Sequence, residues 1–245
     1  MSVATPASQP ATTPRLAARP GGRLPWVVAG SLVLIQAAVA AINLTPLIDS
    51  YTVRTLFDVN GEANLVAWLS SAVLLAIGAG AGLAAAADRA AAAPRRRWLG
   101  WALIGIFFAI LSADEAAGLH ELIGEKAHRV LDISALPSLY TWVLVVGPIG
   151  LVAAVLLVHW FVTTIGFRSI TGRLGLVAIA LWLGVPALEA LDPSLGGPVA
   201  LSVIEESLEA VGEALFLAGV LFYLACPGRF TALVSRPAPS PEASL

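Results

Sequence analysis

Cysteine and charged residues are scarce in this chain of 245 residues, and each scarcity excludes a class of protein. The one cysteine, Cys226, cannot form an internal disulfide framework or a multi-cysteine metal site. Charged residues make up 12% of the chain, well below the share found in soluble domains. The sequence also contains no glycine motif for phosphate or dinucleotide binding. It therefore does not describe a disulfide-bonded secreted domain or a nucleotide-binding enzyme.

Apolar residues dominate instead: hydrophobic residues account for 58% of the chain, and the mean hydropathy is +0.85. A helix needs about 20 predominantly apolar residues to cross the hydrocarbon core of a bilayer. Six segments approach that length, and no polar block large enough for a separate domain remains between them. We therefore predict an all-α polytopic membrane protein, a bundle of six transmembrane helices within residues 24–226. The predicted spans are Leu24–Leu44, Leu65–Ala87, Trp98–Ala113, Leu139–Thr163, Leu174–Leu191 and Leu201–Leu224.

The two ends of the chain differ from this apolar middle. We predict that residues 1–23 form a disordered tail and that residues 227–245 form a second tail, disordered over Arg236–Leu245. The apolar stretch that follows the first tail exceeds the 7–15 residues usual in a signal peptide, which favours an uncleaved first span. Within the second span, Gly78, Gly80 and Gly82 are typical of close helix packing in lipid.

Basic and acidic residues fall on opposite sides of the predicted bundle. Eleven of the fourteen basic residues, including Arg95–Arg97, lie on the side that holds both termini, whereas fourteen of the sixteen acidic residues lie on the other. Because cytoplasmic loops carry the excess of basic residues, both termini are predicted to be cytoplasmic. We interpret the arginines as orientation signals and contacts with anionic lipid, and we expect no nucleic-acid partner. The alanine- and arginine-rich composition indicates a bacterial gene, which predicts a bacterial plasma (inner) membrane protein.

Acidic residues are concentrated in the outer half of the last predicted span. On insertion scales an acidic residue at mid-bilayer costs about 2.5–3.5 kcal/mol, so these side chains should face a protein interior, bind protons or a cation, or pair with another group. At 100° per residue they share an arc of about 100° and a depth of about 12 Å. The alternative is a solvated helix start outside the membrane, which suits the first two better than the last. The four residues are Glu205, Glu206, Glu209 and Glu213.

A second polar group closes the third span, whose helix we expect to continue through Asp114–His120. In one unbroken helix, Asp114, Glu121, Glu125 and His128 would share a face, with His120 about 100° from Glu121 and Glu115 pointing elsewhere. Carboxylates and imidazoles on neighbouring helices are the ligands of di-iron and di-manganese bundle sites, which use two Glu-x-x-His pairs. Only Glu125-Lys-Ala-His128 has that spacing here, and the bland alternative is an interfacial helix end with ordinary charges.

Three further acids are predicted at the same membrane level. Glu189 and Asp192 close the fifth span, just after Pro186, which is expected to kink that helix. Glu62 lies at the start of the second span, where an acid also suits the helix dipole. His159, by contrast, is predicted near the cytoplasmic end of the fourth span, and we interpret it as structural.

The segments Phe57–Ser71, Leu111–Glu121 and Glu205–Gly212 resemble motifs of an uncharacterised group of bacterial six-span membrane proteins. The resemblance implies the six-span architecture and supplies no activity or catalytic role.

Two alternative functions would use the acidic residues, and a third would not need them. The first is a membrane enzyme that acts on a lipid or other apolar substrate and holds one or two divalent metal ions (Fe, Mn, Zn, Mg or Ca). The second is a proton- or cation-coupled transporter that uses the same acids, although no acidic residue continues the pathway inward from Glu213. The third is a non-catalytic assembly protein. The predicted metal ligands are Asp114, His120, Glu121, Glu205, Glu206 and Glu209.

Overall fold

The computed structural model describes residues 22–45, 50–59, 61, 64–131, 141–188 and 198–226, and no strand occurs among them. Six helices are long and apolar enough to cross a membrane, which confirms the all-α fold with six candidate spans. The α6 span continues through the π-helical turn η2 (Phe161–Ile165), and the α7 span continues to Leu188. The six helices are α1 (Leu24–Leu44), α3 (Leu65–Ala90), α4 (Arg95–Ala117), α6 (Thr141–Trp160), α7 (Ile170–Trp182) and α9 (Val199–Leu224).

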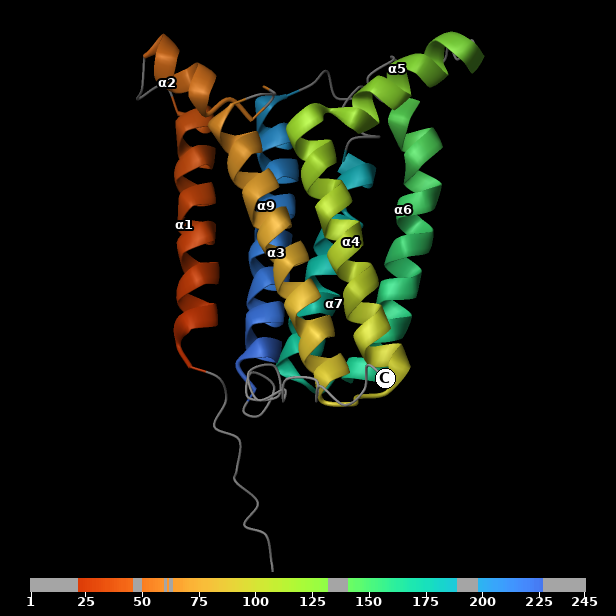
Figure 1. Ribbon diagram of the computed structural model, residues 1–245. Coiled ribbons are helices and arrows are strands. Elements are labelled where there is room, and N and C mark those ends of the chain that lie inside the picture. Colours follow the sequence, from red (N-terminus) through yellow and green to blue (C-terminus); the bar gives the residue numbers. More distant parts are fainter. Residues whose placement is uncertain are drawn as a thin grey trace, which may run out of the picture.

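Helix α9 is the central element of the bundle, because it packs against α1, α3 and α7, while α3 also packs along α4 (Figure 1). Helix α1 begins and α9 ends at the same end of the bundle, which we call the inner end. Two shorter helices, α2 (Tyr51–Leu56) and α5 (Leu119–Leu131), lie at the opposite, outer end. The orientation of these ends in a membrane remains the prediction made from the charges.

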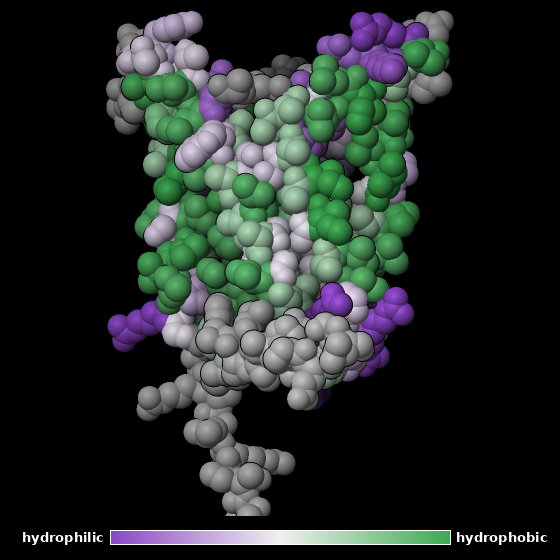
Figure 2. Space-filling model, viewed as in Figure 1, coloured by the Kyte–Doolittle hydropathy of each residue, from purple (hydrophilic) through white to green (hydrophobic). Residues whose placement is uncertain are grey.

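The surface of the bundle matches a bilayer. Hydrophobic side chains cover the middle of the molecule, and hydrophilic ones gather at its two ends (Figure 2). Leu34 on α1, Ile106 on α4 and Ile149 on α6 are each at least 60% exposed at this middle level. Such a broad exposed apolar surface is unfavourable in water and suited to lipid. The chain therefore has the surface of a multi-pass membrane protein.

Glycine allows α3 and α4 to approach closely. A Cβ atom at Gly78 would lie 3.0 Å from the backbone oxygen of Gly105, and a Cβ at Gly105 would lie 3.0 Å from the oxygen of Gly78. On another face of α3, a Cβ at Gly80 would lie 2.7 Å from Val220 Cγ1 of α9. The prediction that glycines of the second span permit close packing is confirmed for these two positions, while Gly82 has open space at its own Cβ position.

Local sequence sets two helix boundaries: the start of α3 at Leu65 agrees with the prediction, and the end of α4 does not. Asn64 begins α3, because its side-chain oxygen accepts hydrogen bonds from the Val66 and Ala67 amides at 2.8 and 3.1 Å. At the outer end, Gly118 adopts a left-handed conformation (φ 58°) and ends α4. The predicted continuation of the third span's helix through Asp114–His120 is therefore wrong beyond Ala117: the chain turns at Gly118 and continues as α5.

Aromatic side chains fill the space between α4, α7 and α9. Phe108 of α4 packs on Phe216 of α9 with ring centroids 4.7 Å apart, and nearer the inner end Trp101 packs on Tyr223 at 4.6 Å. Trp182 of α7 stacks on Phe216 at 5.7 Å. Phe108, Phe216 and Trp101 are almost completely buried. This aromatic core occupies the bundle from the middle to the inner end.

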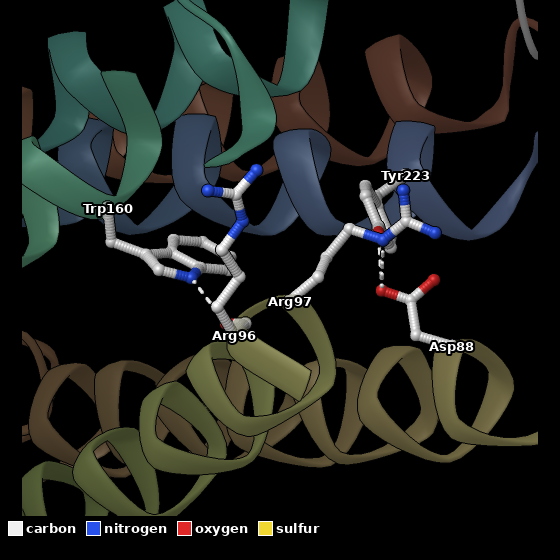
Figure 3. A network of polar contacts seen from close by, with 5 residues as sticks. All are labelled: Asp88, Arg96, Arg97, Trp160 and Tyr223. Atoms are coloured by element: carbon white, nitrogen blue, oxygen red, sulfur yellow. Dashed lines mark hydrogen bonds and ion pairs between the residues drawn. The ribbon is translucent and has the colours of Figure 1, made fainter. Parts of the chain in front are cut away.

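A buried ion pair joins three helices at the inner end (Figure 3). Asp88 of α3 is 1% exposed, and its Oδ2 atom accepts hydrogen bonds from Arg97 Nε of α4 at 3.1 Å and from the Tyr223 hydroxyl of α9 at 2.5 Å. Beside it, Trp160 Nε1 donates to the backbone oxygen of Arg96 at 3.0 Å, which ties α6 to α4. The carboxylate of Asp88 is thus committed to holding the inner ends of the helices together.

Candidate functional site

Glu213 is the most deeply buried of the α9 glutamates, with 5% of its surface exposed. Its Oε1 atom accepts a hydrogen bond from Ser70 Oγ of α3 at 2.6 Å. Its other oxygen, Oε2, has no hydrogen-bond partner within the described part of the chain. A buried carboxylate with only one hydroxyl donor is poorly compensated for the loss of water, so this oxygen has capacity for a further donor.

A cavity of about 80 Å³ lies beside Glu213, between α1, α3 and α9. Its polar lining comes from Glu206, Glu209 and Glu213 of α9, Ser70 of α3 and Gln36 of α1. The remaining described lining residues are apolar, and no lysine, arginine or histidine is among them. This outer cavity therefore combines unbalanced negative charge on one wall with hydrocarbon on the others. Its apolar lining consists of Leu32, Ile35, Val39, Phe57, Leu65, Val66, Leu69, Val73 and Ala210.

Gln36 is a buried polar side chain in the otherwise apolar helix α1, with 6% of its surface exposed. Its Nε2 atom donates to Ser207 Oγ of α9 at 3.3 Å, and Ser207 Oγ in turn donates to the Val203 oxygen at 2.6 Å. This chain of hydrogen bonds fixes α1 against the polar face of α9. The Gln36 amide therefore borders the cavity in a defined position.

The position of the acidic face is fixed from behind by α7. Trp182 Nε1 donates to the backbone oxygen of Glu209 at 3.2 Å. The indole lies so close to Gly212 that a Cβ atom there would meet Trp182 Nε1 at 2.6 Å. Only glycine at this position lets the ring pack flat on α9. The aromatic core begins directly inward of this contact, because Trp182 also stacks on Phe216.

Residues at the outer ends of α4 and α5 contribute to the charge around Glu209. The charges of Glu115, Glu205 and His120 all act on this carboxylate, and Glu115 acts on Glu206 and Glu213 as well. The charge of His120 acts on Glu209, whereas a common site of His120 and Glu121 with the α9 glutamates stays a prediction. The charge of Glu115 also acts on these glutamates, which agrees with its predicted place in the wider polar group, and the direction of its side chain stays a prediction.

Asp114 and His120 are committed to each other across the break at Gly118. Asp114 Oδ1 accepts from the His120 backbone N–H at 2.7 Å, and Asp114 Oδ2 lies 3.1 Å from His120 Nδ1. The His120 ring also packs edge-on against Trp142 of α6, with centroids 4.9 Å apart. Asp114 therefore stabilises the first turn of α5, where an acid accepts free backbone N–H groups.

The remaining predicted residues of α5 turn toward other partners. His128 Nδ1 lies 3.2 Å from Thr141 Oγ1 of α6, and exposed Glu125 is 3.8 Å from Arg129. Glu121 lies one turn before Glu125 on the same helix and is half-buried. Because the helix breaks at Gly118, the single face predicted for Asp114, Glu121, Glu125 and His128 does not exist.

No group of three or more His, Cys, Asp or Glu side chains within the described ranges is placed to hold a metal ion. Glu62, Glu189 and Asp192 lie outside the described residues. A divalent-metal site that includes Asp114, His120, Glu121, Glu205, Glu206 and Glu209 therefore stays a prediction.

Sequence reasoning overlooked two residues that shape the outer cavity, Gln36 and Ser70. Both carried a usable signal: each is an uncharged polar residue inside an apolar span, where an unsatisfied polar group is unfavourable. Ser71, next to Ser70, shows the same principle, because its hydroxyl donates to the Ser112 backbone oxygen of α4 at 2.9 Å. Polar residues isolated in apolar spans here mark contacts between helices.

A family model described as a domain of unknown function (DUF8692) matches residues 26–224, which include all six candidate spans. The chain therefore belongs to this family. No curated protein and no solved structure matches the chain.

Proposed function

We propose that this member of the DUF8692 family is an integral membrane protein that binds a cation in its outer cavity. The observation that carries the proposal is the environment of Glu213. Only 5% of its surface is exposed, it lines the cavity, and its Oε2 atom receives no hydrogen bond from the described part of the chain. A carboxylate buried in this way is unfavourable unless a cation or a proton compensates its charge.

The neighbouring glutamates strengthen the case for a cation. The side chains of Glu206 and Glu209 line the same cavity, and their carboxylates make no hydrogen bond or ion pair within the described residues. Glu115 adds a further negative charge that acts on all three. Like charges in a confined apolar space repel one another, and a bound cation removes that repulsion. Protons occupy the same carboxylates when no other cation is bound.

The geometry supports binding better than a continuous transport pathway. Inward of Glu213, the aromatic core of Phe108, Phe216 and Trp101 fills the bundle. The described acid beyond it, Asp88, is already paired with Arg97 and Tyr223. A transporter built on this cavity would need a second conformation in which the aromatic core separates.

The metalloenzyme is a second candidate, and the contact between Asp114 and His120 favours it. An imidazole oriented by a carboxylate is the arrangement that prepares histidine for metal binding. The charge of the same histidine acts on Glu209. A metal ion would have to draw His120 and the α9 glutamates together. Elemental analysis of protein purified without chelator tests this candidate, and a stoichiometric Fe, Mn or Zn content would support it.

Calorimetric titration of the full chain in phosphatidylcholine nanodiscs tests the main proposal. The probes are Na⁺, K⁺, Mg²⁺, Ca²⁺, Mn²⁺, Zn²⁺ and methylammonium. At least one should bind saturably, and Glu213→Gln, which keeps the shape and an acceptor for Ser70, should weaken that binding at least tenfold. Glu125→Gln is the matched control. Because Glu125 is exposed on α5, this variant should give the same binding curve as the natural protein. Absence of saturable binding for every probe would refute the proposal.

A further inference from the structure

The outer cavity borders the bilayer itself. Helix α1 packs on α9 and makes few contacts with α3, so α1 and α3 form a seam with α9 behind it (Figure 1). The cavity lies in this seam. Ile35 of α1 and Leu65 of α3 line it from either side, and each is 42% exposed. In a membrane, side chains exposed at this position contact lipid, so a ligand can reach the cavity laterally.

The charged side of this cavity and its apolar walls are suited to two different parts of one ligand. Its carboxylates attract a positive charge, whereas Leu32, Ile35, Val39 and Leu69 offer hydrocarbon. A hydrated metal ion needs several converging oxygen ligands and gains nothing from apolar walls. An ammonium group needs only one or two acceptors and keeps its attraction to the remaining charges. An alkyl chain attached to it would lie against the apolar walls.

The size and charge of the cavity further restrict the kinds of ligand that it can bind. Its volume of about 80 Å³ exceeds the roughly 10–15 Å³ that a single water needs, so it holds more than one group of that size. A compact primary ammonium fits, while the rest of the chain must extend along the seam. A phosphate beside the ammonium would face Glu206 and Glu209, and the described part of the lining offers it no basic residue. Phospholipid headgroups are therefore disfavoured.

We infer that the cavity takes up a membrane-dissolved amphiphile with a single apolar chain and a primary ammonium group, which enters between α1 and α3. This inference rests on the proposed function and specifies the class of its cation. The ammonium donates to the Oε2 atom of Glu213, Glu206 and Glu209 contribute attraction, and the chain lies along Ile35 and Leu65 at the seam.

Dodecylammonium, methylammonium and dodecanol separate the two halves of the inference. Each is titrated into the full chain in phosphatidylcholine nanodiscs at pH 7.5, and partition into empty nanodiscs is subtracted. Dodecylammonium should bind one per chain, at least tenfold more tightly than methylammonium, and dodecanol should not bind saturably. Glu213→Gln should weaken the binding of dodecylammonium at least tenfold.

Two tryptophan substitutions on α1 provide the matched test of the lateral route. Ile35→Trp places a large ring in the lining of the seam and should weaken the binding of dodecylammonium at least tenfold. Leu34→Trp is the control, because Leu34 is 72% exposed and does not line the cavity. Equal effects of the two variants would overturn the route. If methylammonium binds and the chain adds no affinity, or if dodecanol binds as tightly, the amphiphile inference fails while cation binding stands. If no cation binds at all, the proposed function fails with it.

Discussion

Single carboxylates in this bundle have opposite surroundings, although both kinds are deeply buried. Asp88 Oδ2 receives donors from Arg97 and Tyr223, and the Arg97 charge compensates the carboxylate, although its Oδ1 atom is buried without a partner among the described residues. Glu213 receives one uncharged donor, Ser70, and borders a cavity. The first arrangement stabilises the fold, because a buried charge with a charged partner holds its helices in place. The arrangement around Glu213 leaves its charge to be compensated by a reversibly bound cation or proton.

The hydroxyl of Tyr223 can be tested for its share in the inner ion pair. Tyr223→Phe removes the hydrogen bond to Asp88 and should lower the free energy of unfolding by about 1.5–3 kcal/mol, the range for hydrogen bonds to charged groups. Denaturant unfolding in detergent micelles measures the change. Tyr51→Phe is the control, since Tyr51 is 84% exposed on α2 and its loss should leave stability unchanged. Equal stability of the two variants would contradict the structural role of this contact.

Cation binding in the outer cavity should depend on pH in one direction. Protons compete for the carboxylates of Glu206, Glu209 and Glu213, so affinity should fall as the pH is lowered and rise as it is increased. Binding should also release protons, which calorimetry in two buffers of different ionisation enthalpy detects. The effect should shrink in Glu213→Gln, because one competing site is gone. Affinity that is independent of pH between 5 and 8 would argue against carboxylate ligands.

At the level of elements, the regular parts of the helices followed from sequence and the breaks did not. The apolar stretch predicted as Leu24–Leu44 matches α1, because hydrophobic length alone defines a span. The turn at Gly118 was missed because the surrounding Ala, Glu and His residues all tolerate a helix, and only a left-handed glycine ends it. That one break moved Glu121, Glu125 and His128 away from the expected face.

The close approach of α3 and α4 predicts that a larger side chain at Gly105 destabilises the bundle. Gly105→Ala would place a methyl group 3.0 Å from the Gly78 oxygen, so the two backbones must separate. We expect a loss of about 1–3 kcal/mol in unfolding free energy, as for other overpacked cores. Gly30→Ala on α1 is the control, because nothing lies within 4 Å of its Cβ position. Thermal unfolding should show the first variant melting lower and the second unchanged or higher.

For the whole molecule, the sequence predicted the positions of the acidic residues well, but it did not predict the residues that surround them. The four α9 glutamates stand out by charge in an apolar span, and three of them line the outer cavity. The cavity itself depends on how α1 and α3 pack on α9, which periodicity within one helix does not reveal. Gln36 belongs to the site only through this packing. The contribution of Glu115 likewise follows from the meeting of separate helices.

The single cysteine reports the orientation of the bundle. Cys226 is exposed just beyond the inner end of α9, and Thr52 is exposed on α2 at the outer end. In intact cells an impermeant thiol reagent should not label the natural chain until the membrane is permeabilised. Thr52→Cys in a Cys226→Ala background should be labelled without permeabilisation. The reverse pattern would show that the termini lie outside the cell.

The depth of Glu213 gives the outer cavity an electrical property. Eleven residues of α9 separate it from Leu224, about 17 Å at 1.5 Å per residue, which places it near half the height of a bilayer core of about 30 Å. A monovalent ion that travels from the outer face to this carboxylate crosses roughly half of the membrane voltage. At about 2.3 kcal/mol per charge per 100 mV, that fraction amounts to about 1.2 kcal/mol. In the predicted orientation, occupancy of the cavity would therefore rise as the cell interior becomes more negative, by about eightfold in affinity per 100 mV.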